Sequence, residues 1–372
     1  MISFRSSVTL TLSIGCLLLV VIWPGWFTVF RAEGSYTPTT NFTDVAVTGD
    51  VAASTAAVQN TNIGIRLATL RGGGTGSGGT GGGASADASR QAVFGRLGLF
   101  LNGLGSFGDQ DKTSRQPGFD FHTTGLTLGA DYKLTDNLIL GTAFGYLNTQ
   151  AEINASAGHV ATNGYSLSAF GTYYIANTMH VDAITTYGWN AYDIERNIQG
   201  INETARAHPA GNQFAISVGS GYDFNFGPLT AGPILRVNYL DAHVNGYQER
   251  GAATSDLKVN SQNPESVTTD LGAQVSYAIS VPWGVLSPMA RFEWEHEYKN
   301  DSRLITSRFV TNPGTVLVAP TNDPDRDYFN LGAGLTATFK RGTTAFFYYE
   351  AVLGRDNYTN HSFTAGVRFE FD

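Results

Sequence analysis

The sequence predicts an all-β fold, a 12-stranded antiparallel transmembrane β-barrel with an N-terminal α-helix in its lumen. Three observations lead to this prediction: apolar residues alternate with small or polar residues, tight turns alternate with long loops, and the composition is unusual. Only 15% of the 372 residues are charged, against about 25% in typical soluble domains. Glycine contributes 44 residues and aromatic side chains make up 12% of the chain.

Composition and charge exclude several classes of protein. The mean hydropathy of −0.10 is too low for a bundle of membrane helices, and only one segment approaches the ~18 apolar residues that a spanning helix needs. A net charge of −8 argues against nucleic-acid binding. The single cysteine, Cys16, lies in the apolar N-terminal run, so the chain after that run has no thiol for catalysis or for zinc. A secreted β-sandwich shares this composition and is still possible at this point.

The first 90 residues divide into four segments. Residues 1–33 are predicted to be an export signal, because a basic residue precedes an apolar run; an uncleaved inner-membrane anchor is the alternative. Residues 34–53 show no clear period and are too few for a folded domain. Residues 54–71 are predicted to form a helix that the following glycines stop. The Gly-rich residues 72–90 are predicted to be a flexible linker.

From residue 91 to the end, large apolar side chains alternate with Gly, Ser, Thr and charged side chains. Leu235 and Val237, for example, share one face of a strand, whereas Arg236 and Asn238 share the other. Each stretch has about the 9–11 residues that a tilted strand needs to cross a bilayer. The clearest stretches are 138–146, 213–226, 229–240, 271–279, 285–298 and 329–339.

The connections between these strands are short and long in alternation, which separates a membrane barrel from a sandwich. Tight turns rich in turn residues are predicted at 134–137, 175–178, 225–228, 281–284 and 340–343. Longer polar loops are predicted at 107–119, 151–160, 198–210, 243–266, 299–326 and 354–361. An interfacial girdle is predicted from the aromatic residues near the strand ends: Tyr132, Tyr173, Tyr174, Phe224, Phe226, Trp283 and Phe339.

A ring of twelve strands has room for one helix. Eight strands leave space only for side chains, and sixteen or more enclose an open channel. A helix is about 10–12 Å across, and residues 54–71 at about 1.5 Å each span roughly 27 Å, close to the ~25 Å height of the apolar band. The predicted helix therefore fits the lumen, the space inside the ring.

Several long blocks of the sequence are similar to one known family. They are "NTNIGIRLATLRGG" (60–73), "GRLGLFLNGLGSFGDQD" (95–111), "PGFDFHTTGLTLGADYKLTDNLILGTAFGY" (117–146) and "FGTYYIANTMHVDAITTYGWNAYDIER" (170–196). Together with the aromatic C-terminus, they resemble the translocator domain of classical bacterial autotransporters over about residues 54–372. In that family a twelve-stranded barrel with a helix in its pore accompanies secretion of an N-terminal passenger.

The resemblance implies the outer membrane of a Gram-negative bacterium and type V secretion. Residues 34–53 would then be a minimal passenger remnant, and 91–372 the barrel that supports export or surface display of an N-terminal segment. The implied partners are outer-membrane lipid, the barrel-assembly machinery and periplasmic chaperones, and we expect a monomer. Neither an enzymatic activity nor a cofactor is expected. A stand-alone surface adhesin acting through loops 243–266 and 299–326, or a small-solute channel, is the alternative.

Charged side chains on the polar face of the strands are expected to line the lumen. Mixed signs favour paired networks that hold the wall and the helix together. Arg66 and Arg71 of the helix are expected to pair with lumen carboxylates. Phe369 and Phe371 form the C-terminal assembly signal that the resemblance implies, although Asp372 follows them. The lumen-lining set is Arg236, Arg291, Glu293, Glu295, Glu350 and Arg368, with Asp131, Asp182, Asp223 and Glu370 on the same face.

Two further features suggest chemistry only weakly. His180 and Asp182 share the inner face and are a candidate hydrolase pair, but no serine partner is identifiable. Asn60 and Asn62 lie near the start of the predicted helix, and some autotransporters cut their chain by asparagine cyclisation. The motif is incomplete here, so a capping or lumen hydrogen-bonding role is favoured. The histidines show no metal-ligand spacing, and no metal is expected.

Overall fold

The computed structural model describes residues 18–23, 26–31, 45–72, 96–176, 178–299, 301–323, 325–339 and 342–371. The chain forms two units, Met1–Thr40 and Asn41–Asp372. In the first unit, β1 (Leu18–Trp23) and β2 (Trp26–Arg31) pair as an antiparallel hairpin. No helix among the described ranges is long and apolar enough to cross a membrane. Most of the predicted export signal, residues 1–33, lies outside the described residues, and its cleavage stays a prediction.

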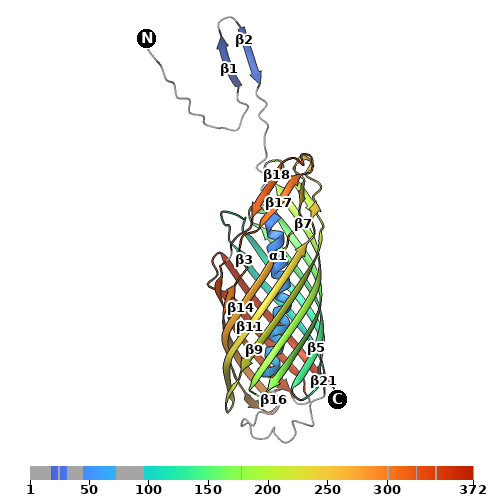
Figure 1. The fold of residues 1–372 in the computed structure, drawn as a ribbon, viewed down its shortest axis with the longest axis vertical. Helices are drawn as coiled ribbons and strands as arrows, with labels where there is room; N and C mark the ends of the chain where they lie inside the picture. The colour runs from blue at the N-terminus through green and yellow to red at the C-terminus, as the bar shows by residue number, and fades with distance from the viewer. Residues whose placement is uncertain are drawn as a thin grey trace, which may run out of the picture. The chain divides into compact units, whose positions relative to one another are not determined.

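Twelve long antiparallel strands of the second unit form one closed ring (Figure 1). The last strand pairs with the first, from Tyr358↔Gln110 to Phe371↔Leu97, and this pairing closes the ring. Closure leaves no free strand edge, so the backbone groups of the wall can be paired without water. The predicted fold class is confirmed. The strands are β3 (Leu97–Gln110), β4 (Phe119–Lys133), β5 (Leu138–Ile153), β6 (Gly158–Ile175), β7 (Met179–Ile198), β9 (Ala210–Tyr222), β11 (Leu229–Val244), β14 (Glu265–Tyr277), β16 (Gly284–Glu297), β19 (Asp327–Phe339), β20 (Thr344–Leu353) and β21 (Tyr358–Phe371).

The alternation in the sequence corresponds to an outward and an inward face. On β11, Leu235 and Val237 are each 47% exposed. Asn238 points the other way and donates hydrogen bonds to Thr268 Oγ1 at 3.0 Å and Asp270 Oδ2 at 2.9 Å. Large apolar side chains therefore face outward and hydrogen-bonded polar side chains face inward, the reverse of a soluble sandwich.

All five predicted tight turns fall between consecutive barrel strands at one end of the ring, which we call the turn end. The other end holds the long connections and is called the loop end. Two of the predicted longer loops, 151–160 and 354–361, are short there, because strands extend into them and leave only 154–157 and 354–357 as connections. The aromatic girdle residues at the turn end are exposed, with the exception of Tyr174. The prediction for Tyr174 is wrong, because its neighbour Tyr173 takes the outward position and adjacent residues of a strand point to opposite faces.

Helix α1 spans Val45–Gly72 and runs inside the ring (Figure 1). It begins at Val45 rather than at Ser54, so the predicted helix start is wrong, and the last part of the segment 34–53 belongs to the helix. Sequence patterning does not reveal this start, because a helix inside a barrel does not need an apolar stripe opposite a solvent-facing polar one. Residues 73–95 lie outside the described residues. Most of the predicted linker and the predicted barrel start at Gln91 fall in this range and stay predictions.

The two longest loops fold into a second, four-stranded antiparallel sheet at the loop end, which we call the cap sheet. Its strands are β12 (Tyr247–Gln248), β13 (Leu257–Val259), β17 (Leu304–Phe309) and β18 (Val316–Pro320), in that order. Beside it, β8 (Glu203–Ala207) pairs with the end of β7. The remaining short elements are β10 (Phe224–Phe226), β15 (Ile279–Val281) and the 3-10 turns Asn154–Ser156 and Ala253–Ser255.

Candidate functional site

Helix α1 lies along one side of the lumen and packs mainly against β5, β6, β7, β9 and β11. Small or β-branched side chains allow this close packing: Ala52, Ala56 and Ile63 are completely buried. Gly64 brings the helix against the wall, because a Cβ atom at this position would lie 3.4 Å from Arg236 Nη1. The predicted placement of a helix in the lumen is confirmed.

Polar side chains of α1 hydrogen-bond to the wall at successive levels of the lumen. Near the loop end, Thr55 Oγ1 lies 3.1 Å from Thr149 Oγ1 of β5. Further along, Asn62 Nδ2 donates to Thr127 Oγ1 of β4 at 2.9 Å. Because hydrogen bonds have strict geometry, these pairs fix the position of the helix along the barrel axis and its rotation about its own axis.

Asn60 and Asn62 lie in the middle of α1 and therefore do not cap it. Thr186 Oγ1 donates to Asn60 Oδ1, and Asn102 Nδ2 donates to Asn62 Oδ1, each at 3.5 Å. Both asparagines are buried. The capping interpretation is wrong, and these contacts agree with the lumen hydrogen-bonding interpretation.

Asp131 of β4 joins the helix to the C-terminal strand near the turn end. Its carboxylate lies 3.4 Å from Arg66 Nη2 of α1 and accepts hydrogen bonds from Arg368 of β21, at 2.5 Å from Nη2 and 3.1 Å from Nε. Arg368 also pairs with Glu370. The Arg66 guanidinium lies over the Phe100 ring, with 5.2 Å between Cζ and the ring centroid. Arg66 thus lies beside a lumen carboxylate, the kind of partner expected for it.

The other side of the lumen, toward β14, β16, β19 and β20, is lined by charged side chains. Arg291 pairs with Glu293, and both are almost fully buried. Asn330 donates to Glu295 at 2.6 Å. A cavity of about 370 Å³ lies between these strands and α1. Its lining includes five of the six predicted lumen residues, namely Arg236, Arg291, Glu293, Glu295 and Glu350.

A buried ion pair holds the cap sheet to the barrel. Arg196 Nε of β7 donates to Glu249 Oε1 at 2.9 Å, and the other Glu249 oxygen accepts the Leu257 amide at 2.8 Å. Arg196 Nη2 also donates to the Ser255 carbonyl at 2.8 Å. Charge pattern alone does not reveal this pair, because Arg196 and Glu249 are separated in sequence by a whole hairpin.

The cap sheet also covers the first turns of α1. Gln262 Nε2 donates to the Val45 carbonyl at 2.9 Å, and Arg303 Nη2 lies 3.7 Å from Asp50 Oδ1. Burial lowers the pKa of Arg303, and the Asp50 carboxylate opposes that shift. An apolar cluster completes the contact: Val45, Ala46, Val47 and Val51 of the helix with Leu257, Val259, Ile305 and Ala319 of the cap.

His180 lies in the wall near the turn end, between two carboxylates. Its Nε2 is 4.0 Å from Asp182 Oδ2 and its Nδ1 is 3.7 Å from Asp223 Oδ2. Thr172 donates a hydrogen bond to Asp182 at 2.8 Å. The structure thus brings the predicted pair together inside the wall. Among the described residues, no group of three or more His, Cys, Asp or Glu side chains could hold a metal ion.

The remaining predicted site residues lie at the turn end. Phe369 and Phe371 face outward on β21, each 47% exposed. Arg71 lies in the last turn of α1. The pairing of Arg71 and the assembly role of the two phenylalanines stay predictions.

The family model described as autotransporter beta-domain matches residues 99–350, from β3 to β20. The chain belongs to the autotransporter β-domain family. It is an outer-membrane translocator barrel of the Gram-negative type.

The curated relatives of this autotransporter barrel are much longer proteins. It is 28% identical to "Esterase EstA" of Pseudomonas aeruginosa over 58% of this chain and 34% of that protein. It is 24% identical to "Lipase 1" of Photorhabdus luminescens over 67% of this chain and 38% of that protein. "Outer membrane protein A" of Rickettsia conorii is 26% identical over 80% of this chain and 15% of its own. The chain thus spans little more than a third of these relatives at most.

Solved translocator domains share the fold. The translocator domain of the autotransporter NalP from Neisseria meningitidis superposes with a TM-score of 0.65 at 17% identity, covering 87% of this chain and 99% of that one. The β-domain of the Bordetella autotransporter BrkA gives a TM-score of 0.58 at 18% identity, covering 74% and 100%.

Proposed function

We propose that this barrel carries the segment preceding Val45 to the cell surface and holds it there. The observation that supports this most directly is the direction of α1. Its first residue lies under the cap sheet at the loop end, and Arg66 lies near the turn end. In outer-membrane barrels the long loops are extracellular and the short turns periplasmic. Val45, the first described residue of α1, therefore lies at the outer mouth of the lumen.

We further propose that the barrel itself is not an enzyme. The esterase and lipase among its relatives are far longer, and this chain matches only about a third of each. The lumen contacts described above join helix to wall, as a structural network does. Assembly by the barrel-assembly machinery, with delivery by periplasmic chaperones, belongs to the same proposal, and so does the monomeric state.

Surface labelling tests the direction of export. An epitope inserted between residues 40 and 41 should be labelled by antibody on intact cells, and externally added protease should remove it. The same epitope in the tight turn at 134–137 is the matched control and should be reached only after the outer membrane is permeabilised. Labelling of the turn epitope on intact cells, or protection of the upstream one, would contradict the proposal.

A surface adhesin is the second candidate, and the cap sheet is the observation that favours it. The sheet orders the two longest loops at the loop end and leaves Leu304, Val316 and Val318 exposed, at 70%, 50% and 44%. Exposed apolar groups on a surface sheet are candidates for partner contact. Cell binding that depends on these three side chains, measured with serine variants, would support the adhesin role.

A further inference from the structure

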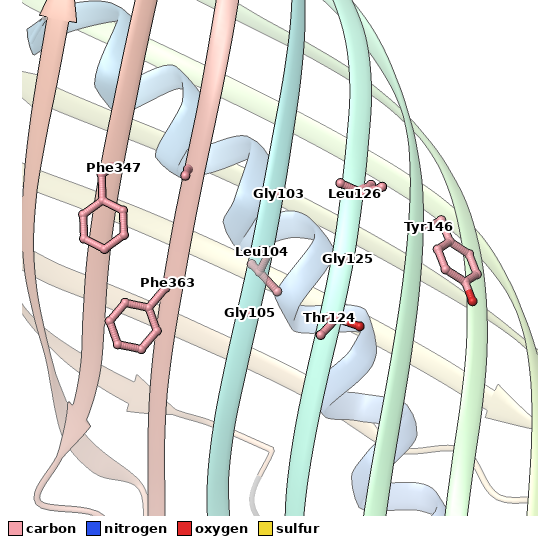
Figure 2. Close-up of a pocket in the computed structure, with 10 residues that line it drawn as sticks. Gly103, Leu104, Gly105, Thr124, Gly125, Leu126, Tyr146, Phe347 and Phe363 are labelled. Atoms are coloured by element: carbon pink, nitrogen blue, oxygen red, sulfur yellow. The ribbon is translucent and has the colours of Figure 1, made fainter.

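A groove on the outward face of the barrel lies where the last strand meets the first. We call it the seam groove. It has a volume of about 540 Å³, a floor of Gly103 and Gly105 of β3 with Ala365 of β21, and walls that include Leu126 and Phe347. Figure 2 shows Phe347 on one side of β3 and Leu126 on the other, with the glycines between them.

Strand register explains the shape of the groove. One row of paired residues crosses five strands, from Phe347 through Ala365, Gly103 and Leu126 to Tyr146. Large side chains stand at both ends of this row and small ones in its middle. The row therefore forms a trough that runs along β21 and β3.

Other outward residues close the trough above and below. On β3, the outward position before Gly103 is Leu101, at 46% exposed, and the one after Gly105 is Phe107, at 50%. Phe107 stacks on Phe363 of β21 with ring centroids 6.0 Å apart. The seam groove is thus a bounded apolar hollow in the outward face.

We infer that the seam groove holds one acyl chain of a lipid of the surrounding bilayer. It lies within the outward apolar face, which is already the lipid interface of the barrel. An unfilled hollow there would forfeit dispersion contacts along its whole lining, and water is a poor occupant of a site with so few polar atoms.

The dimensions favour a chain of lipid over a second barrel. The walls stand on β20 and β4, three strand spacings apart, or roughly 14 Å between backbones. Side chains such as Phe347 and Leu126 rise from these strands and narrow the gap further. The wall of a second barrel is convex and broad, so it would rest on these ridges without reaching Gly103.

Gly105 offers a direct way to fill the seam groove. A Cβ atom built on Gly105 meets no heavy atom within 4 Å, so this position has open space for the start of a side chain, and Gly105→Phe adds a ring on the floor of the groove. Leu101→Phe is the matched control, because it adds an aromatic ring on the same face of the same strand just outside the groove. Ala365→Leu fills the floor from β21 and serves as a second variant if Gly105→Phe fails to fold.

The test is native mass spectrometry of the full chain released from nanodiscs of dimyristoyl phosphatidylcholine, with folding checked by heat-modifiable gel migration. At activation that strips loosely bound lipid, the wild-type chain and Leu101→Phe should each retain one phosphatidylcholine. Gly105→Phe and Ala365→Leu should retain none. Equal retention in all variants, or no retention by the wild type, would overturn the proposal. So would a mass of two barrels that Gly105→Phe separates, because a second copy would then be the occupant.

Discussion

The carboxylate of Asp131 lies 3.4 Å from the guanidinium of Arg66, and this contact joins the lumen helix to the barrel wall. Both side chains are only 1% exposed. The same carboxylate binds Arg368, two residues before Glu370 on the C-terminal strand. One acidic group thus connects the first described helix of the barrel unit to its last strand.

Replacing this group should destabilise the barrel. In Asp131→Asn the ion pair with Arg66 is lost and Arg368 keeps its pair with Glu370, and breaking a buried ion pair costs about 3–5 kcal/mol. The temperature at which gel migration shifts from the folded to the unfolded form should fall clearly. Asp136→Asn is the control, since the Asp136 side chain is 95% exposed and pairs with Lys133 on the surface, where a pair is worth about 0–1 kcal/mol. Equal shifts in the two variants would show that Asp131 is not an anchor.

Arginine should be tolerated on one face of β11 and not on the other. Leu235→Arg places a charge on the lipid face, at a cost of about 2–4 kcal/mol near the bilayer midplane. Asn238→Arg points into the lumen, where Asp270 lies within hydrogen-bonding distance of the native side chain. Folded yield in lipid vesicles should fall far more for Leu235→Arg. The reverse order would refute the assignment of faces.

Removing α1 should open the pore. Deletion of residues 45–72 takes away the helix, its contacts with Asp131 and the apolar contact beneath the cap sheet. We expect a folded barrel with higher single-channel conductance in planar bilayers and a lower unfolding temperature. Deletion of residues 34–42, upstream of the helix, should change neither. An unchanged conductance after removal of α1 would mean that the helix does not block the lumen, and would favour the small-solute channel.

The ion pair between Arg196 and Glu249 should keep the cap sheet closed. Glu249→Gln removes a buried charge that Arg196 and the Leu257 amide both contact. Protease added to intact cells should then cut loop 243–266 faster than in the wild type. Glu265→Gln is the matched control, because the pair of Glu265 with Lys299 at 3.0 Å is exposed. Identical cutting rates in both variants would show that the ion pair of Glu249 does not keep the cap sheet closed.

Sequence predicted the wall of the barrel well because lipid imposes a simple rule on it. Every second residue of a spanning strand must be apolar, so positions such as Leu235 and Asn238 can be assigned without knowing their neighbours. The predicted lumen charges follow from the same rule. Tyr174 shows where it fails: two adjacent aromatics cannot both face outward, and composition alone does not say which one does.

The start of α1 and the cap sheet depend on contacts that no local pattern records. Val45 to Ala53 lack an amphipathic period because the wall, the cap sheet and the polar lumen cavity surround them, so the helix has no single solvent face opposite an apolar one. The cap pairs β13 with β17 across the hairpin of β14 and β16. Its strands are short and lie in polar loops, so neither loop sequence by itself predicts a strand. Only the register Leu257↔Phe309 shows that the halves form one sheet.

The spacing of the helix contacts has a mechanical consequence. A load applied outward to whatever is attached before Val45 pulls along the axis of α1. The hydrogen bonds of Thr55 and Asn62 and the ion pair of Arg66 are stacked along that axis, so the load reaches them together, in shear, and not one after another. The Gln262 contact at Val45 bears the same pull at the mouth of the pore. An anchor built this way resists tension from outside while it needs no covalent link to the wall.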